Sequence, residues 1–156
     1  MNILEKLTSI HEELYQNSQE KTDILIEGSA EKLQHLLIKE RKYIQLLEQF
    51  EVKRQKEVEK WFASKQFNTE EKTITKMMQI TSNELEKKKL ENSMIRLTNI
   101  ITKLKQQEQL NNDLMRQSMQ FVQMSLEILN PTIDHMNYGN KEIKQTANRS
   151  VFDSQA

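Results

Sequence analysis

The stretch that decides the fold is residues 83–130, NELEKKKLENSMIRLTNIITKLKQQEQLNNDLMRQSMQFVQMSLEILN. It contains neither glycine nor proline, and Leu90, Leu97 and Leu104 fall on one face of a helical projection. Apolar residues at this spacing predict an amphipathic α-helix. At about 1.5 Å per residue the helix would be about 70 Å long. Pro131 follows directly and predicts the end of the helix, because proline disfavours helical continuation.

The chain before residue 83 also has helical periodicity. We expect one helix over residues 3–26 and a second over residues 30–64, each with a single apolar stripe. Gly28 and Ser29 separate them, since glycine suits the C-terminal cap of a helix and serine the N-terminal cap of the next.

A short helix is expected over residues 69–80, where Asn68 followed by Glu71 fits an N-terminal capping pattern. The run 81–84, Thr-Ser-Asn-Glu, repeats the capping signal. Two interpretations stay open for this run: a break between two helices, or one helix that continues through it.

These elements predict an all-α fold. The expected architecture is an elongated antiparallel helical bundle or coiled coil. Residues 30–64 and 83–130 would form its spine, and residues 3–26 would pack alongside. The predicted domains are a helical bundle over residues 1–130 and a flexible polar tail over residues 131–156, because the tail lacks a periodic apolar face.

Composition narrows the function classes. Two glycines and one proline in 156 residues are too few for the turns of β-sandwiches, barrels or doubly wound folds. A formal net charge of +0 lacks the basic field of a nucleic-acid-binding protein. The chain has no apolar run long enough for a membrane span, and its acidic, amphipathic start does not resemble a signal peptide. We expect a cytoplasmic protein.

Motifs for catalysis are missing from the sequence. A di-iron helical bundle needs Glu-x-x-His, but Thr8, Lys32 and Thr132 lie three residues before the three histidines. There is no cysteine for thiolate metal ligation, and the two glycines are too far apart for a phosphate-binding loop. We therefore expect no enzymatic activity, no catalytic residue, no metal and no cofactor.

The last part of the predicted helix is apolar over an unusually wide face. In residues 114–130 the apolar side chains spread over an arc of about 220°, whereas packing in a small bundle uses roughly 100–140°. Several of these residues are methionines, whose flexible side chains adapt to different partners. We predict a partner-binding surface made of Leu114, Met115, Met119, Val122, Met124, Leu126 and Leu129. Of these, Met115, Met119, Val122 and Leu126 are the favoured anchors, and Phe121 and Ile128 would then face the bundle.

The C-terminal half resembles the flagellar export chaperones of the FlgN type. That family shows an Asn, a Leu-Leu pair, a Ser-Leu-x-Phe stretch, an alternating Leu run and a Tyr-Gly pair. The corresponding positions in this chain are Asn111, Leu114-Met115, residues 118–121, Leu126 and Leu129, and Tyr138-Gly139. Glu108 departs from the pattern, since the family often has a second Asn there.

The resemblance implies a cytoplasmic chaperone for type III protein export. Its implied partners are the hook–filament junction proteins, bound through their C-terminal helical segments, and components of the flagellar export gate and ATPase. Tyr138 is the implied docking residue for the export gate. The alternative is a structural coiled-coil or adaptor protein that self-associates through its C-terminal helix, because Leu90, Met94 and Leu97 have heptad spacing.

Overall fold

The computed structural model describes the backbone of residues 2–67 and 69–150 and the side chains of residues 3–67 and 69–129. Four helices follow one another along the chain: α1 (Asn2–Glu27), α2 (Ala30–Ser64), α3 (Ile74–Ile80) and α4 (Glu84–Ser150). Within these ranges there is no β-strand. The predicted all-α class is confirmed.

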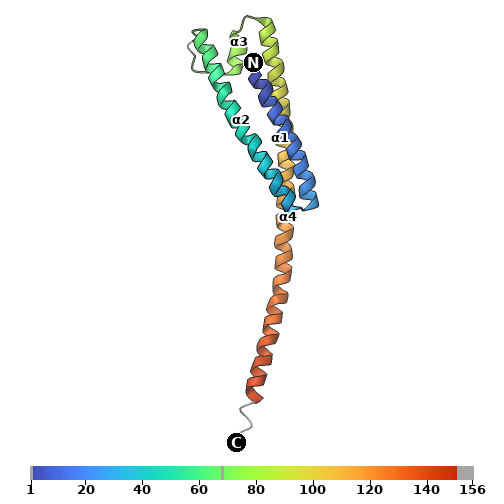
Figure 1. Cartoon of the computed structure of the whole chain (residues 1–156). Helices are drawn as coiled ribbons and strands as arrows, with labels where there is room; N and C mark the ends of the chain where they lie inside the picture. Colours follow the sequence, from blue (N-terminus) through green and yellow to red (C-terminus); the bar gives the residue numbers. More distant parts are fainter. Residues whose placement is uncertain (1, 68, 151–156) are drawn as a thin grey trace. The chain divides into compact units, whose positions relative to one another are not determined.

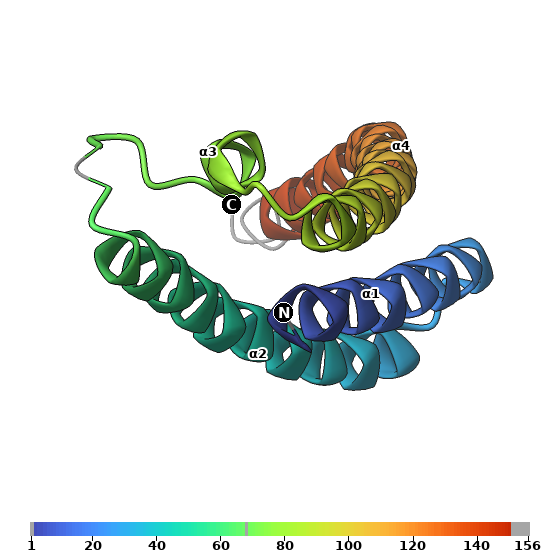
Figure 2. The same cartoon turned by 90° about the horizontal axis from the view of Figure 1, so that it is seen from above.

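The chain divides into two units, residues 1–114 and residues 115–156, and α4 contributes to both. In the N-terminal unit, α1 and the first part of α4 run in one direction and α2 runs in the other (Figure 1). Seen from above, α1 lies beside both α2 and α4 (Figure 2). This helix was predicted to pack alongside a spine of the other two, but it supplies eight of the buried residues: Leu4, Leu7, Thr8, Leu14, Asn17, Ser18, Lys21 and Ile24.

The apolar core joins all four helices at the end of the bundle that holds the N-terminus. It contains Leu4, Leu7, Val58, Phe62, Ile74, Leu90 and Leu97. Phe62 has no exposed surface, and its ring meets Trp61 edge to face with 5.0 Å between the centroids. Burial of these side chains is the main favourable term for folding, at roughly 1.5–3 kcal/mol for each large apolar residue. Some large apolar side chains of α2 and α4 lie outside this core and are exposed, such as Ile38 and Leu85.

The turn between α1 and α2 forms at the predicted residues. Gly28 has φ of 77°, the left-handed conformation that a residue without Cβ adopts most readily, and its N–H donates to the Ile24 carbonyl at 2.9 Å. The Ser29 hydroxyl accepts a hydrogen bond from the backbone N–H of Lys32 at 3.4 Å. Because this turn is so short, it fixes how α1 and α2 align.

The segment between α2 and α4 differs in part from the prediction. The short helix begins at Ile74 instead of residue 69, because Thr73 caps it by accepting from the N–H of Lys76 at 3.2 Å. Asn68, the predicted cap, lies outside the described residues. The run 81–84 is a true break, since the Asn83 side chain accepts from the N–H of Leu85 at 3.0 Å and starts a new helix.

The predicted helix end at Pro131 is wrong. The helix α4 continues to Ser150, so residues 131–150 are helical and only residues 151–156 of the predicted tail lie outside the described backbone. Proline removes one backbone donor and crowds one carbonyl, but the turns on either side keep their own hydrogen bonds. The predicted domain boundary at residue 130 stays a prediction.

Candidate partner-binding surface

The predicted partner-binding residues from Met119 onward are exposed. The exposed fractions are 73% for Met119, 56% for Val122, 62% for Met124 and 57% for both Leu126 and Leu129. Leu114 and Met115, on either side of the boundary between the two units, are half-buried. Large apolar side chains that are exposed together in a row indicate an interaction site.

The apolar residues of 115–129 form two stripes on α4, and all of them except the half-buried Met115 are exposed. The first, which we call stripe A, consists of Met115, Met119, Val122, Leu126 and Leu129, at alternating intervals of four and three. The second, stripe B, consists of Phe121, Met124 and Ile128. Phe121 and Ile128 were predicted to face the bundle, and this prediction is wrong: they are 73% and 71% exposed.

Polar residues border the two stripes. Ser118 and Ser125 lie between them on one side of the helix, and the Ser125 hydroxyl donates to the Phe121 carbonyl at 2.8 Å. Gln120, Gln123 and Glu127 lie on the other side. A shallow groove includes Met119, Val122 and Leu126 of stripe A with glutamines at its edge. An apolar centre with a polar border is the usual composition of a protein interface.

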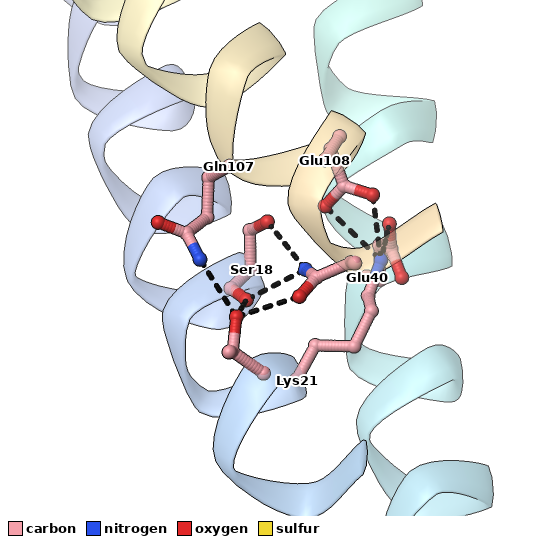
Figure 3. A network of polar contacts seen from close by, with 7 residues as sticks. Ser18, Lys21, Glu40, Gln107 and Glu108 are labelled. Atoms are coloured by element: carbon pink, nitrogen blue, oxygen red, sulfur yellow. Dashed lines mark hydrogen bonds and ion pairs between the residues drawn. The ribbon is translucent and has the colours of Figure 1, made fainter. Parts of the chain in front are cut away.

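In the N-terminal unit, a cluster of polar side chains around Lys21 lies between α1, α2 and α4. The Lys21 side chain is 6% exposed, and its ammonium donates to the carboxylate of Glu40 on α2 at 2.8 Å. It also donates to both oxygens of Glu108 on α4 at 3.1 Å (Figure 3). One cation thus connects three helices.

Hydrogen bonds extend this contact between α1 and α4. The Asn111 side chain, which has no exposed surface, donates to the Ser18 carbonyl at 2.8 Å and to its hydroxyl at 3.0 Å. The Thr22 hydroxyl donates to the Asn111 amide oxygen at 2.6 Å and accepts from Gln107 at 2.6 Å. We call the whole set the polar layer: Ser18, Lys21, Thr22, Glu40, Gln107, Glu108 and Asn111.

The polar layer was not predicted from the sequence. Its signal was available, because Lys21 follows Leu7 and Leu14 at seven-residue intervals and so continues the buried stripe of α1. Asn17, beside the layer, is 2% exposed, and neither polar atom of its side chain has a hydrogen-bond partner among the described residues. Burial of an unpaired amide costs stability, so the side chain of Asn17 does not stabilise the fold through hydrogen bonds.

The titratable groups with shifted pKa lie on α2. The hydrogen bond from Tyr43 to Glu13, at 3.0 Å, raises the pKa of the Tyr43 phenol above 10.0. The hydrogen bonds from Arg54 hold the pKa of the Glu51 carboxyl below 4.5. Each pair tethers one side chain to a neighbour, which is a structural role. Among the described residues, no three or more acidic, histidine or cysteine side chains are grouped to hold a metal ion, and no helix could span a membrane.

Comparison with known families decides the identity. The family profile described as FlgN protein matches residues 1–145, nearly the whole chain. The chain belongs to the FlgN family. This match confirms the resemblance inferred from the sequence. FlgN proteins are chaperones.

A relative of this FlgN-family chain is the uncharacterized protein YvyG of Bacillus subtilis strain 168. The two are 33% identical over 156 residues, which cover 98% of this chain and 94% of the relative. No solved structure matches the chain significantly.

Tyr138 and Gly139 of the FlgN pattern lie in α4. The side chain of Tyr138 is outside the described residues. Its role in docking to the export gate stays a prediction.

Proposed function

We propose that this protein is a cytoplasmic flagellar export chaperone. It binds the helical terminal segments of hook–filament junction proteins through residues 114–129, prevents their premature assembly and delivers them to the export apparatus. Membership of the FlgN family supports the chaperone class. The single observation that supports the location of the site is the row of exposed apolar side chains on stripes A and B.

Apolar burial would drive the binding. A cargo helix with its own apolar stripe would remove stripe A from water, at roughly 25 cal/mol per Å² of apolar area. Because one helix covers roughly 100–140° of a neighbour, the arc of about 220° calls for cargo with more than one helix. Methionines such as Met119 and Met124 make contacts that tolerate repacking, which suits a complex that must later release its cargo.

Delivery would use a separate part of α4. Under this proposal Tyr138 contacts a component of the export gate, whereas residues 114–129 hold the cargo. Tyr138→Ala should then reduce secretion of the junction proteins while the calorimetric affinity for cargo stays unchanged. Normal secretion in this variant would remove Tyr138 from the proposed site.

The test of the cargo site is a charged variant of stripe A. Met119→Glu with Val122→Glu places two carboxylates on the proposed interface, and burying them without partners would be costly. Isothermal titration calorimetry with C-terminal fragments of junction proteins should show binding to the unaltered chain and none to the variant. Circular dichroism should show that the variant is still helical, because both side chains are exposed in the free protein.

A matched control changes two exposed apolar residues elsewhere on α4. Leu85→Glu with Ile95→Glu adds the same charges at positions that are 65% and 52% exposed in the N-terminal unit. This variant should bind cargo like the unaltered chain. Undiminished affinity in the folded stripe A variant would place the cargo site elsewhere.

Self-association is the second candidate, and the spacing of stripe A favours it. Alternating intervals of four and three are the pattern of a coiled-coil seam, so a second copy could cover the same residues. Analytical ultracentrifugation separates the two functions. A free monomer that binds cargo fragments supports the chaperone function. A stable oligomer that binds none of the fragments supports a structural protein.

A further inference from the structure

The polar residues of α4 interrupt a seven-residue apolar repeat. Without them, this repeat would allow α4 to align with α1 in more than one way. Seven residues before and after Glu108 the sequence has Ile101 and Met115. Seven residues before and after Gln107 it has Ile100 and Leu114. One heptad before Asn111 it has Leu104. Helices that repeat apolar residues every seven positions can slide by one heptad and still bury apolar surface. Only the polar residues distinguish one alignment from the next.

The connections along the chain do not fix the alignment of α4 with α1, so side-chain contacts must do so. The two-residue turn Gly28–Ser29 already fixes α1 against α2, whereas residues 65–83, which include α3, separate α2 from α4. A connection of this length can follow a sliding helix. Outside the polar layer, Glu12 of α1 and Arg96 of α4 form an ion pair at 3.9 Å. Both side chains are largely exposed, so this pair stabilises the fold little.

We propose that the polar layer sets the register of α4 against the α1–α2 hairpin. In the observed register Lys21 has two carboxylates and Asn111 has three hydrogen-bonded contacts on α1. A shift by one heptad would place the Lys21 ammonium against an apolar residue of α4 and separate Asn111 from Ser18. Buried polar groups lose more when they are unpaired than they contribute when they are paired, so the layer penalises wrong registers more than it stabilises the correct one.

The first test removes the α4 side of the layer. In the variant Glu108→Leu with Asn111→Leu, Lys21 keeps Glu40 and the hydroxyls of Ser18 and Thr22 can bond to backbone carbonyls, so no buried charge is left alone. Its urea midpoint should equal or exceed that of the unaltered chain. The matched control, Glu91→Leu with Asn99→Leu, makes the same changes at exposed positions of α4.

Register is measured with two spin labels. The chain has no cysteine, so labels attach only at introduced ones, and Glu12→Cys with Arg96→Cys places them on α1 and α4. Electron–electron double resonance should give one narrow distance for the unaltered chain and the control. The layer variant should show a second or broadened distance, because a one-heptad slide moves α4 by about 10 Å. A single unchanged distance, or loss of helicity in this variant, would overturn the proposal.

A swap variant tests the direction of the effect. Exchanging Glu108 with Ile101 (Glu108→Ile, Ile101→Glu) and Asn111 with Leu104 (Asn111→Leu, Leu104→Asn) moves the polar groups one heptad along α4 at constant composition. If the layer sets the register, the helix should follow it and the label distance should shift to the displaced value. A swap variant that keeps the original distance would contradict the proposal.

Discussion

Two stretches of the same helix carry apolar residues at helical spacing, and they differ in exposure. Leu90 and Leu97 are 5% and 8% exposed in the core of the N-terminal unit, whereas Met119 and Val122 are 73% and 56% exposed in the second unit. The first stretch packs against helices of its own chain. In the part of the chain that the structure describes, the second stretch has no such cover. An apolar stripe therefore predicts a packing partner, but it does not show whether that partner belongs to the same chain.

The largest expected effect is a difference in the free energy of unfolding between alanine variants of one phenylalanine from each unit. Phe62→Ala should lower the free energy of unfolding by about 3–5 kcal/mol, because it empties the centre of the core. Phe121→Ala should change it by less than about 0.5 kcal/mol, since its ring is already in water. Urea unfolding followed by circular dichroism measures both. Equal losses would break the comparison by showing that stripe B also packs in the free protein.

The second prediction compares the stability lost when a buried lysine and an exposed lysine are removed from their ion pairs. Lys21→Ala leaves Glu40 and Glu108 without their shared cation and should destabilise the protein by about 3 kcal/mol. Lys32→Ala breaks the ion pair with Glu27, whose partners are more than half exposed, and should cost less than about 1 kcal/mol. Thermal melts at matched protein concentration give the two values. Similar values would mean that the polar layer is open to solvent.

A third prediction concerns the turn that aligns α1 with α2. Gly28→Ala should destabilise the protein by about 1–2 kcal/mol, because an L-residue is strained at φ of 77°. Gly28→Asn should cost less, since asparagine visits this conformation more readily. No heavy atom lies within 4 Å of a Cβ built at this position, so a steric clash does not contribute. An alanine variant as stable as the unaltered chain would show that the turn can adopt another conformation.

The smallest expected effect depends on pH. The pKa of Glu51 is lowered in the folded protein by the hydrogen bonds from Arg54, so this pair stabilises the fold above pH 4.5 and stops doing so as the pH falls through the folded pKa. Glu51→Gln should cost less than about 1 kcal/mol at pH 7, because the carboxylate is partly exposed. The difference from the unaltered chain should disappear in acid. Urea titrations at pH 7 and at a series of lower pH values measure it, and a difference that does not decrease with pH would assign it to packing.

Local rules in the sequence predicted much of the fold. Glycine and serine at positions 28 and 29 marked the first turn, because capping depends on a few neighbouring residues. The capping signal at residues 81–84 left a break and a continuous helix open, and the structure has the break. The stop at Pro131 failed for the opposite reason: proline weakens a helix locally and cannot by itself decide whether the following residues continue it.

Contacts between distant residues could not be predicted in the same way. Lys21, Glu40 and Glu108 read as ordinary surface charges in the sequence, and only the packing of three helices brings them together. Likewise, the apolar excess of residues 114–129 was visible in the sequence. The orientation assigned to Phe121 and Ile128 was not, because it depends on what the helix packs against.

The most direct test of the cargo site is hydrogen–deuterium exchange of the full chain with and without a C-terminal fragment of a junction protein. If stripes A and B hold the cargo, backbone amides of residues 115–129 should exchange more slowly when the fragment is bound. The amides around Phe62 should exchange at the same rate in both samples, because that core is already formed. Slower exchange confined to residues 1–114 would contradict a cargo site on the second unit.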